Sequence, residues 1–103
     1  MNQTERITLM EQYLDDADAV MKAYSDALRA YREIQPKLRE LAEYYSGEDW
    51  RKDFEDDEAG RLPKDLKRGV LSEDSVYDVL SDNREMQAAT LETMAEILRE
   101  GRF

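Results

Sequence analysis

The sequence predicts an all-α fold: an antiparallel helical hairpin or bundle with a long kinked N-terminal helix, an irregular head and a C-terminal helix. Apolar residues recur every three or four positions over residues 3–45 and again over 73–100. No stretch alternates as a strand would. Between the two periodic segments, residues 44–74 contain the only Trp and three of the four Gly. We call this stretch the head, and expect one helical domain over residues 1–103.

We expect residues 3–34 to form a helix, because apolar residues recur in three rows, within each of which successive members are seven positions apart. The rows are Ile7, Leu14, Met21 and Leu28; Met10, Ala17, Tyr24 and Tyr31; and Tyr13, Val20, Ala27 and Ile34. Three apolar positions in seven make a wide face, which is typical of a bundle helix rather than of a two-stranded coiled coil. The Tyr residues of this helix are therefore expected to be core.

Pro36 leaves two alternatives for the first helix. A proline inside a helix costs about 3 kcal/mol or more and kinks or ends it. No Gly, Asn, Asp or Ser lies between Tyr31 and Leu41, and the apolar phase continues to Tyr45. We therefore expect a kinked helix that reaches Tyr45. The alternative is a break at Gln35-Pro36, which would make residues 36–46 the middle helix of a three-helix monomer.

The first half of the head is expected to hold a short helix. Gly47 suits the left-handed position that follows a helix end. Asp49 can cap the next helix, which carries Trp50 and Phe54 on one face. Gly60 is expected to end it. We expect Trp50, the largest apolar side chain of the head, to be a buried anchor.

The second half of the head is expected to turn and then anchor itself by apolar side chains. Pro63 fixes its own backbone and disfavours helix at Leu62, so Leu62-Pro63 opens a turn. The expected anchors that follow are Leu66, Val70 and Leu71.

The last helix is expected over residues 73–100. Ser72 is a strong N-cap, and Leu71 and Val76 occupy the two positions of a hydrophobic staple around it. Gly101 should end the helix, leaving Arg102-Phe103 frayed. Its apolar face is interrupted by polar residues, namely Asn83, Gln87 and Thr90.

Three segments of the sequence carry a resemblance. They are ERITLMEQYL near the start, YYSGEDW, and DFEDDEAGRLPKDLKRGVLSEDSVYDVL. Together they resemble the small bacterial family known as domain of unknown function 4298, over nearly the whole chain. The resemblance implies a small soluble bacterial protein that is mostly helical. It implies no activity, substrate or catalytic residue.

Composition narrows the function classes. The chain has no Cys and no His, which removes thiolate chemistry, the commonest general base and the commonest metal ligand. Carboxylates are abundant, but no spacing pairs them for catalysis. We therefore expect no enzyme and no cofactor. A net charge of −10 disfavours nucleic acid and anionic membranes as partners. With no apolar run near 20 residues and no signal peptide, the expected location is cytoplasmic.

The head supplies the candidate interaction surface. Its members are aromatic or basic: Tyr44, Tyr45, Trp50, Phe54, Arg61, Lys64, Lys67 and Arg68. Aromatic side chains dominate binding hot spots, but such a cluster also serves as the core of an irregular segment. The four cations are expected to pair with the acidic run Asp53–Glu58. The favoured hypothesis is a non-enzymatic protein-interaction module that binds an unknown protein partner through the head.

Two other functions stay open at this point. The acidic run could hold a divalent cation or small ligand, with hydrolytic chemistry, although an EF-hand loop from Asp53 would place Glu58 where Gly is needed and Lys64 where Glu is needed. The acidic chain could also act as a decoy that occupies a nucleic-acid-binding protein.

The length of the first helix also predicts a homodimer. A helix from residue 3 to residue 45 is about 65 Å long, and one over 73–100 is about 42 Å. One returning helix cannot cover so long and wide an apolar face. Two protomers in a four-helix arrangement would cover it.

Overall fold

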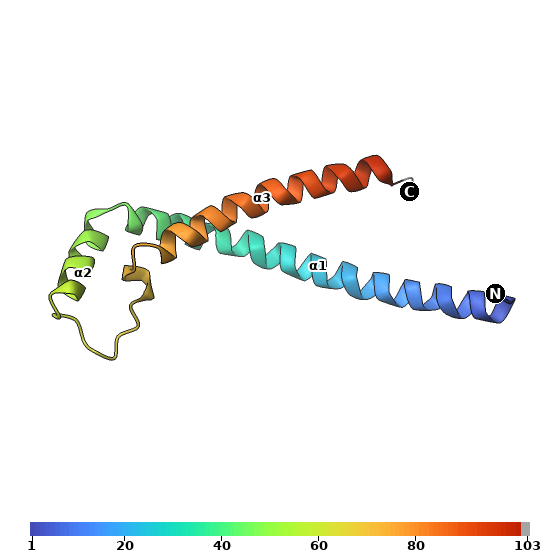
Figure 1. Ribbon diagram of the computed structural model, residues 1–103, viewed down its shortest axis with the longest axis horizontal. Helices are drawn as coiled ribbons and strands as arrows, with labels where there is room; N and C mark the ends of the chain where they lie inside the picture. The colour runs from blue at the N-terminus through green and yellow to red at the C-terminus, as the bar shows by residue number, and fades with distance from the viewer. Residues whose placement is uncertain (102–103) are drawn as a thin grey trace. The chain divides into compact units, whose positions relative to one another are not determined.

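The computed structural model describes residues 1–101 and is helical along most of them (Figure 1). Helix α1 spans Gln3–Tyr45, α2 spans Glu48–Glu58, the 3₁₀ turn η1 spans Gly69–Leu71 and α3 spans Ser75–Glu100. No strand occurs among the described residues, which confirms the all-α prediction. The prediction for Arg102-Phe103 lies outside the described residues. The chain divides into two units, Met1–Lys37 and a second that begins at Leu38, and each is described by itself.

Helix α1 runs without interruption through Pro36, which confirms the predicted continuation and excludes the break at Gln35-Pro36. Its first turn carries a cap that the sequence-based prediction missed. The Asn2 side-chain oxygen accepts the Glu5 backbone N–H at 2.8 Å, and the Asn2 amide donates to the Glu5 carboxylate at 2.5 Å. The first of these bonds satisfies a backbone donor that the helix itself leaves unpaired.

The first unit, which we call the arm, consists of residues 1–37. None of the residues of α1 is buried. The apolar face of the arm, here called the stripe, is open along its length. Its large side chains and their exposed fractions are Ile7 54%, Met10 49%, Tyr13 56%, Leu14 56%, Val20 62%, Met21 66%, Tyr24 45%, Leu28 51% and Ile34 40%. Tyr13 and Tyr24 are therefore not core residues of the single chain that the structure describes, and the prediction is wrong for these two.

The second unit is centred on η1, which contacts both α2 and α3. Leu71 at the end of η1 is 5% exposed and Val76 in the first turn of α3 is 2% exposed. They are the two buried apolar residues of the described chain, and they are the pair predicted as a hydrophobic staple. Because Asp74 precedes α3, Leu71 and Val76 do not occupy the two staple positions that were predicted, but both buried residues lie where the head joins α3.

Two predicted helix starts are wrong. Helix α2 begins at Glu48 after Gly47, so Asp49 lies within its first turn and is not its cap. Helix α3 begins at Ser75, two residues later than predicted, and Asp74 rather than Ser72 precedes it. The Ser72 hydroxyl nonetheless accepts the Ser75 backbone N–H at 3.2 Å, three residues ahead, as a capping hydroxyl does.

Gly47 is not left-handed as predicted, because its φ is −102° and its ψ 178°. The reason for glycine at this position is a close approach of two backbone segments. A Cβ at Gly47 would lie 3.1 Å from the carbonyl oxygen of Glu43 in the last turn of α1. The missing side chain lets α2 start immediately after α1 ends.

Candidate functional site

The aromatic residues of the head pack on one another. Trp50 stacks on Phe54, with ring centroids 5.1 Å apart and an interplanar angle of 18°. Tyr45, from the last turn of α1, meets Trp50 edge-on at 5.1 Å and 70°. The Trp50 indole N–H donates to the carbonyl of Val70 in η1 at 2.9 Å. Trp50 is half-buried rather than fully buried, and it links α1, α2 and η1.

Two tyrosine hydroxyls fix the end of α1 to the rest of the head. Tyr45 donates to the backbone carbonyl of Glu73, just before α3, at 2.8 Å. Tyr44 donates to the Asp53 carboxylate on α2 at 2.6 Å. Burial, the hydrogen bond to Asp53 and the negative charges of Asp53 and Asp49 raise the pKa of Tyr44 from 10.0 to about 12. The Tyr44 hydroxyl therefore keeps its proton at physiological pH and acts as a donor.

Gly60 ends α2, as predicted, with a left-handed φ of 72°. The Gly60 N–H donates to the Asp57 carbonyl at 3.0 Å and the Arg61 N–H to the Asp56 carbonyl at 2.9 Å. These two bonds make a Schellman motif, which pairs carbonyls at a helix end. The Arg61 guanidinium also pairs with the Asp56 carboxylate at 3.0 Å. These backbone bonds and the ion pair thus fix the direction in which the chain leaves α2.

Arg68 holds the end of the same loop. Its guanidinium donates to the Asp57 carboxylate at 2.5 Å and to the backbone carbonyls of Pro63 and Lys64, both at 3.1 Å. The Arg68 side chain is 31% exposed and that of Asp57 is 22% exposed. Because one planar group reaches three acceptors, Arg68 orders the turn after Pro63 and joins it to α2. The predicted pairing of the cations with the acidic run therefore holds for Arg61 and Arg68.

The other two cations of the head differ from these arginines. Among the described residues, neither the Lys64 nor the Lys67 side chain makes an ion pair or a hydrogen bond. Leu66 lies between them in the sequence and is 48% exposed, so its predicted role as an apolar anchor is wrong. The Leu66 N–H donates to the Pro63 carbonyl at 3.2 Å, which closes the turn. An ordered turn thus presents one apolar, one acidic and two cationic side chains to solvent, the acidic one being Asp65.

A shallow groove of about 310 Å³ lies beside this turn. Its lining residues come from α1, α2, the loop and η1, and they are Tyr44, Asp53, Leu62, Leu66, Lys67, Arg68, Val70 and Leu71. Four of the eight are Leu or Val. Tyr44 and Asp53, which are hydrogen-bonded to each other, both line it. The groove therefore combines apolar side chains with one fixed polar pair and with Lys67, a cation that has no partner in the described part of the chain.

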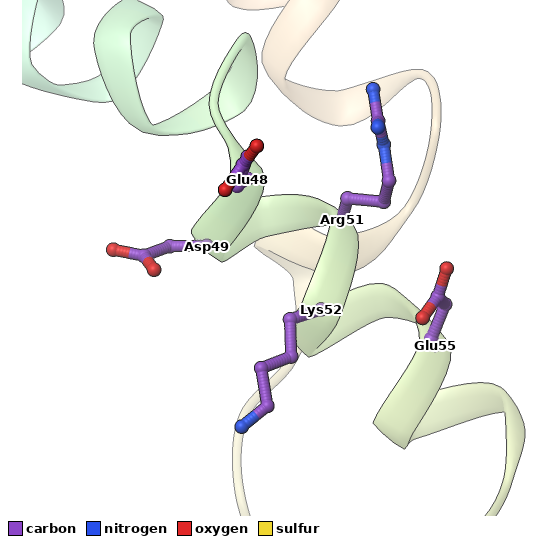
Figure 2. Close-up of a pocket in the computed structure, with 5 residues that line it drawn as sticks. All are labelled: Glu48, Asp49, Arg51, Lys52 and Glu55. Atoms are coloured by element: carbon purple, nitrogen blue, oxygen red, sulfur yellow. The ribbon is translucent and has the colours of Figure 1, made fainter.

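A second hollow is lined by other side chains of α2, which carry both positive and negative charges (Figure 2). It is lined by Glu48, Asp49, Arg51, Lys52 and Glu55. Their ends point in different directions, and the three carboxylates do not converge on a common point (Figure 2). Across residues 1–101, no three acidic side chains gather as a metal site requires. The geometry gives the divalent-cation hypothesis no ligand set in this part of the chain.

Of the eight predicted surface residues, the structure places the four aromatics and the two arginines in contacts within the head. Tyr44, Arg68 and Lys67 line the groove, whereas Trp50 and Phe54 pack against each other beside it. Sequence reasoning missed five lining residues, and it had assigned three of them to apolar anchoring instead: the five are Asp53, Leu62, Leu66, Val70 and Leu71, and the three are Leu66, Val70 and Leu71. Val70 and Leu62 carried a detectable signal, since each is an isolated apolar residue in a charged segment. The Tyr44–Asp53 pair carried none, because its members lie nine residues apart across a helix boundary.

No helix within residues 1–101 has a stretch both long and apolar enough to span a bilayer. Residues 7–93 match the family described as Domain of unknown function (DUF4298), and the chain belongs to that family. No curated protein and no solved structure matches the chain.

Proposed function

We propose that this member of the DUF4298 family is a non-enzymatic protein-interaction module whose head groove binds a peptide segment of a partner protein. The segment carries one large apolar side chain next to Asp or Glu. The observation that carries the proposal is the turn at Lys64–Lys67 in a chain of net charge −10. There an exposed Leu66 and an exposed Asp65 lie between two cations that have no ion-pair partner within residues 1–101. The expectations of a bacterial, cytoplasmic protein that binds neither nucleic acid nor membrane remain part of this proposal.

The fixed position of the groove supports this function. Two of its lining residues are fixed by hydrogen bonds, since Arg68 donates to Asp57 on α2 and the Val70 carbonyl accepts the Trp50 indole N–H. A binding surface that is ordered before the partner arrives loses less entropy on association. The turn therefore presents Leu66 and Lys67 in a preformed arrangement.

The difference between the two arginines and the two lysines also supports it. Arg61 and Arg68 are neutralised by Asp56 and Asp57, so they add little positive potential. Lys64 and Lys67 have no such partner among the described residues. In a protein of net charge −10, a local pair of cations favours an acidic segment at this turn over the acidic parts of the surface.

A displayed library of random peptides tests the proposal. Peptides selected on the whole protein should share one large apolar residue with Asp or Glu close to it. A selected peptide should then bind the Lys67→Glu variant about tenfold more weakly, which corresponds to about 1.4 kcal/mol. Leu66→Ala should weaken it as well, and because Leu66 is half-exposed this variant keeps the fold.

The matched control is Lys52→Glu, which makes the same charge change in the second hollow on α2 (Figure 2). It should leave peptide affinity unchanged. Selection of no consensus above background, or equal affinity of the Lys67→Glu and Lys52→Glu variants, would contradict the proposal.

A further inference from the structure

The stripe on the arm is larger than the surface of a monomer normally leaves open. Its nine large side chains are 40% to 66% exposed. At these fractions they present on the order of 900 Å² of mostly apolar surface, whereas the largest apolar patch of a typical monomer is about 300–600 Å². A partner in a standard-size interface buries about 800 Å² on each side. The stripe therefore has the area of a complete protein–protein interface.

The chain's own last helix is too short to cover the first. Helix α1 has 43 residues and α3 has 26, so 17 residues of α1 exceed the length of α3. These 17 residues correspond to about 25 Å of helix. The apolar positions are also three in seven, which is wider than the face one neighbouring helix covers. A second chain is needed to bury the stripe.

The charges along the arm favour a second copy of the same chain. Residues 5–18 contain five carboxylates and one arginine, a net side-chain charge of −4. Residues 22–37 contain four cations and two carboxylates, a net charge of +2. Two arms packed antiparallel place the acidic half of each against the basic half of the other. Parallel packing would place the two acidic halves together.

The sizes of the side chains agree with the antiparallel arrangement. The stripe runs from Ile7 to Ile34, so a two-fold axis through its middle lies close to Val20 and Met21. In that register the small Ala17 faces Tyr24 of the other chain, and by symmetry Tyr24 faces Ala17. Leu14 faces Ala27 in the same way, so large residues lie opposite small ones at these two pairs of positions, where the helices can approach closely.

We propose that the protein is a homodimer in which the stripes of two arms pack antiparallel, with the dimer axis near Val20 and Met21. Glu11 and Arg32 flank the stripe on the same side and come within one helical turn of each other across the interface. Among the described residues neither side chain has an ion-pair partner within its own chain. The proposal is independent of the head groove and of its peptide.

Sedimentation equilibrium of the whole protein tests the assembly. The expected mass is twice the 12.1 kDa chain mass at micromolar concentration, falling toward one chain on dilution. Met21→Glu places two carboxylates near the axis and should raise the dissociation constant at least a hundredfold. Ala19→Glu adds the same charge on the opposite face of α1 and should change it less than threefold. Glu11→Arg should weaken the dimer, and Arg32→Glu in the same chain should restore it.

Cross-linking tests the orientation, and the absence of native Cys makes each introduced thiol unique. With a short bismaleimide, Val20→Cys should link two chains because the position lies near the axis. Ile7→Cys should not, because antiparallel arms hold the two copies about 40 Å apart. Efficient linkage through Ile7→Cys would overturn the antiparallel arrangement. A one-chain mass up to hundreds of micromolar, with the stripe covered by the chain's own α3, would overturn the dimer.

Discussion

The head and the arm reverse the usual relation between regular sequence and stable structure. The arm has the most regular apolar pattern in the chain, yet none of its residues is buried. The head is irregular and highly charged, yet it contains the stacked rings, the Schellman motif and the Arg68 bonds. It also contains Leu71, one of the two apolar residues that are buried within residues 1–101. In the arm, the regular apolar pattern thus marks a surface that needs a neighbour. In the head, specific side-chain contacts stabilise a segment that has no regular pattern.

The difference between the arm and the head has an energetic basis. Isolated helices gain little from their own hydrogen bonds, and most helix stability in proteins comes from packing of an apolar face. The arm therefore depends on whatever covers its stripe. The head depends on side-chain bonds between residues of the same chain, so its stability should not vary with protein concentration.

The largest effect on the head is expected from Trp50→Ala. It removes the stacking on Phe54, the contact with Tyr45 and the bond to Val70. Because Trp50 is only half-buried, the loss should lie near the lower end of the range for such changes, about 3 kcal/mol. Denaturant unfolding followed by circular dichroism measures it. Trp50→Phe keeps a stacked ring and should lose about 1 kcal/mol; equal losses for both variants would show that only the indole N–H matters.

The next largest effect is expected from Arg68→Met. It breaks three hydrogen bonds and leaves the partly buried Asp57 carboxylate unpaired, at a cost of about 2 kcal/mol in the free energy of unfolding. Arg61→Met breaks one ion pair of an arginine whose side chain is 68% exposed, so it should cost less than about 1 kcal/mol. If urea unfolding gives the two variants the same stability, Arg68 does not order the loop.

A smaller effect is expected from Gly60→Ala, because alanine resists the left-handed backbone that Gly60 adopts at φ 72°. The cost should be about 1–2 kcal/mol. Gly69→Ala is the matched control: a Cβ meets nothing within 4 Å at either glycine, but Gly69 has no positive φ. The free energy of unfolding of this variant, measured by thermal unfolding, should change by less than about 0.5 kcal/mol. A Gly60→Ala protein as stable as the control would exclude conformational strain as the reason for this glycine.

The smallest effect appears only in alkali. Since the folded protein raises the pKa of Tyr44 from 10.0 to about 12, its stabilising contribution is complete below pH 10 and is lost as the pH rises from 10 to 12. Stability of the wild-type protein should fall over this interval more steeply than that of Tyr44→Phe. Tyr77→Phe, which alters a tyrosine that is 62% exposed, is the control and should follow the wild type. Parallel curves for all three proteins would contradict the role of the Tyr44–Asp53 bond.

Much of the fold could be predicted because it depends on local chemistry. The phase of the apolar rows predicted that α1 continues through Pro36, and Gly60 predicted the end of α2. The start of α3 was predicted to within two residues, although its cap and the staple positions were not. The failures at Gly47 and Asp49 share one cause. A tight connection between α1 and α2 leaves no residue free to act as a side-chain cap, and the sequence does not show how closely two helices approach.

The groove could be predicted only in part. Lys67, Arg68 and Tyr44 were among the candidate residues, but the sequence could not separate cations that pair within the head from those that remain free. That difference depends on which carboxylates the loop reaches after it turns at Gly60 and Pro63. The exposure of Leu66 follows from the same turn, because the bond from its N–H to Pro63 leaves the side chain on the outside.

Hydrogen exchange at several protein concentrations, resolved by peptide, tests the central difference between the two regions most directly. The backbone amides of residues 7–34 should exchange faster on dilution, because the stripe loses its partner chain. The amides of α2, η1 and the first turn of α3 should keep their protection at every concentration. Protection of the arm that does not change with concentration, or loss of protection in the head in parallel with the arm, would contradict the account.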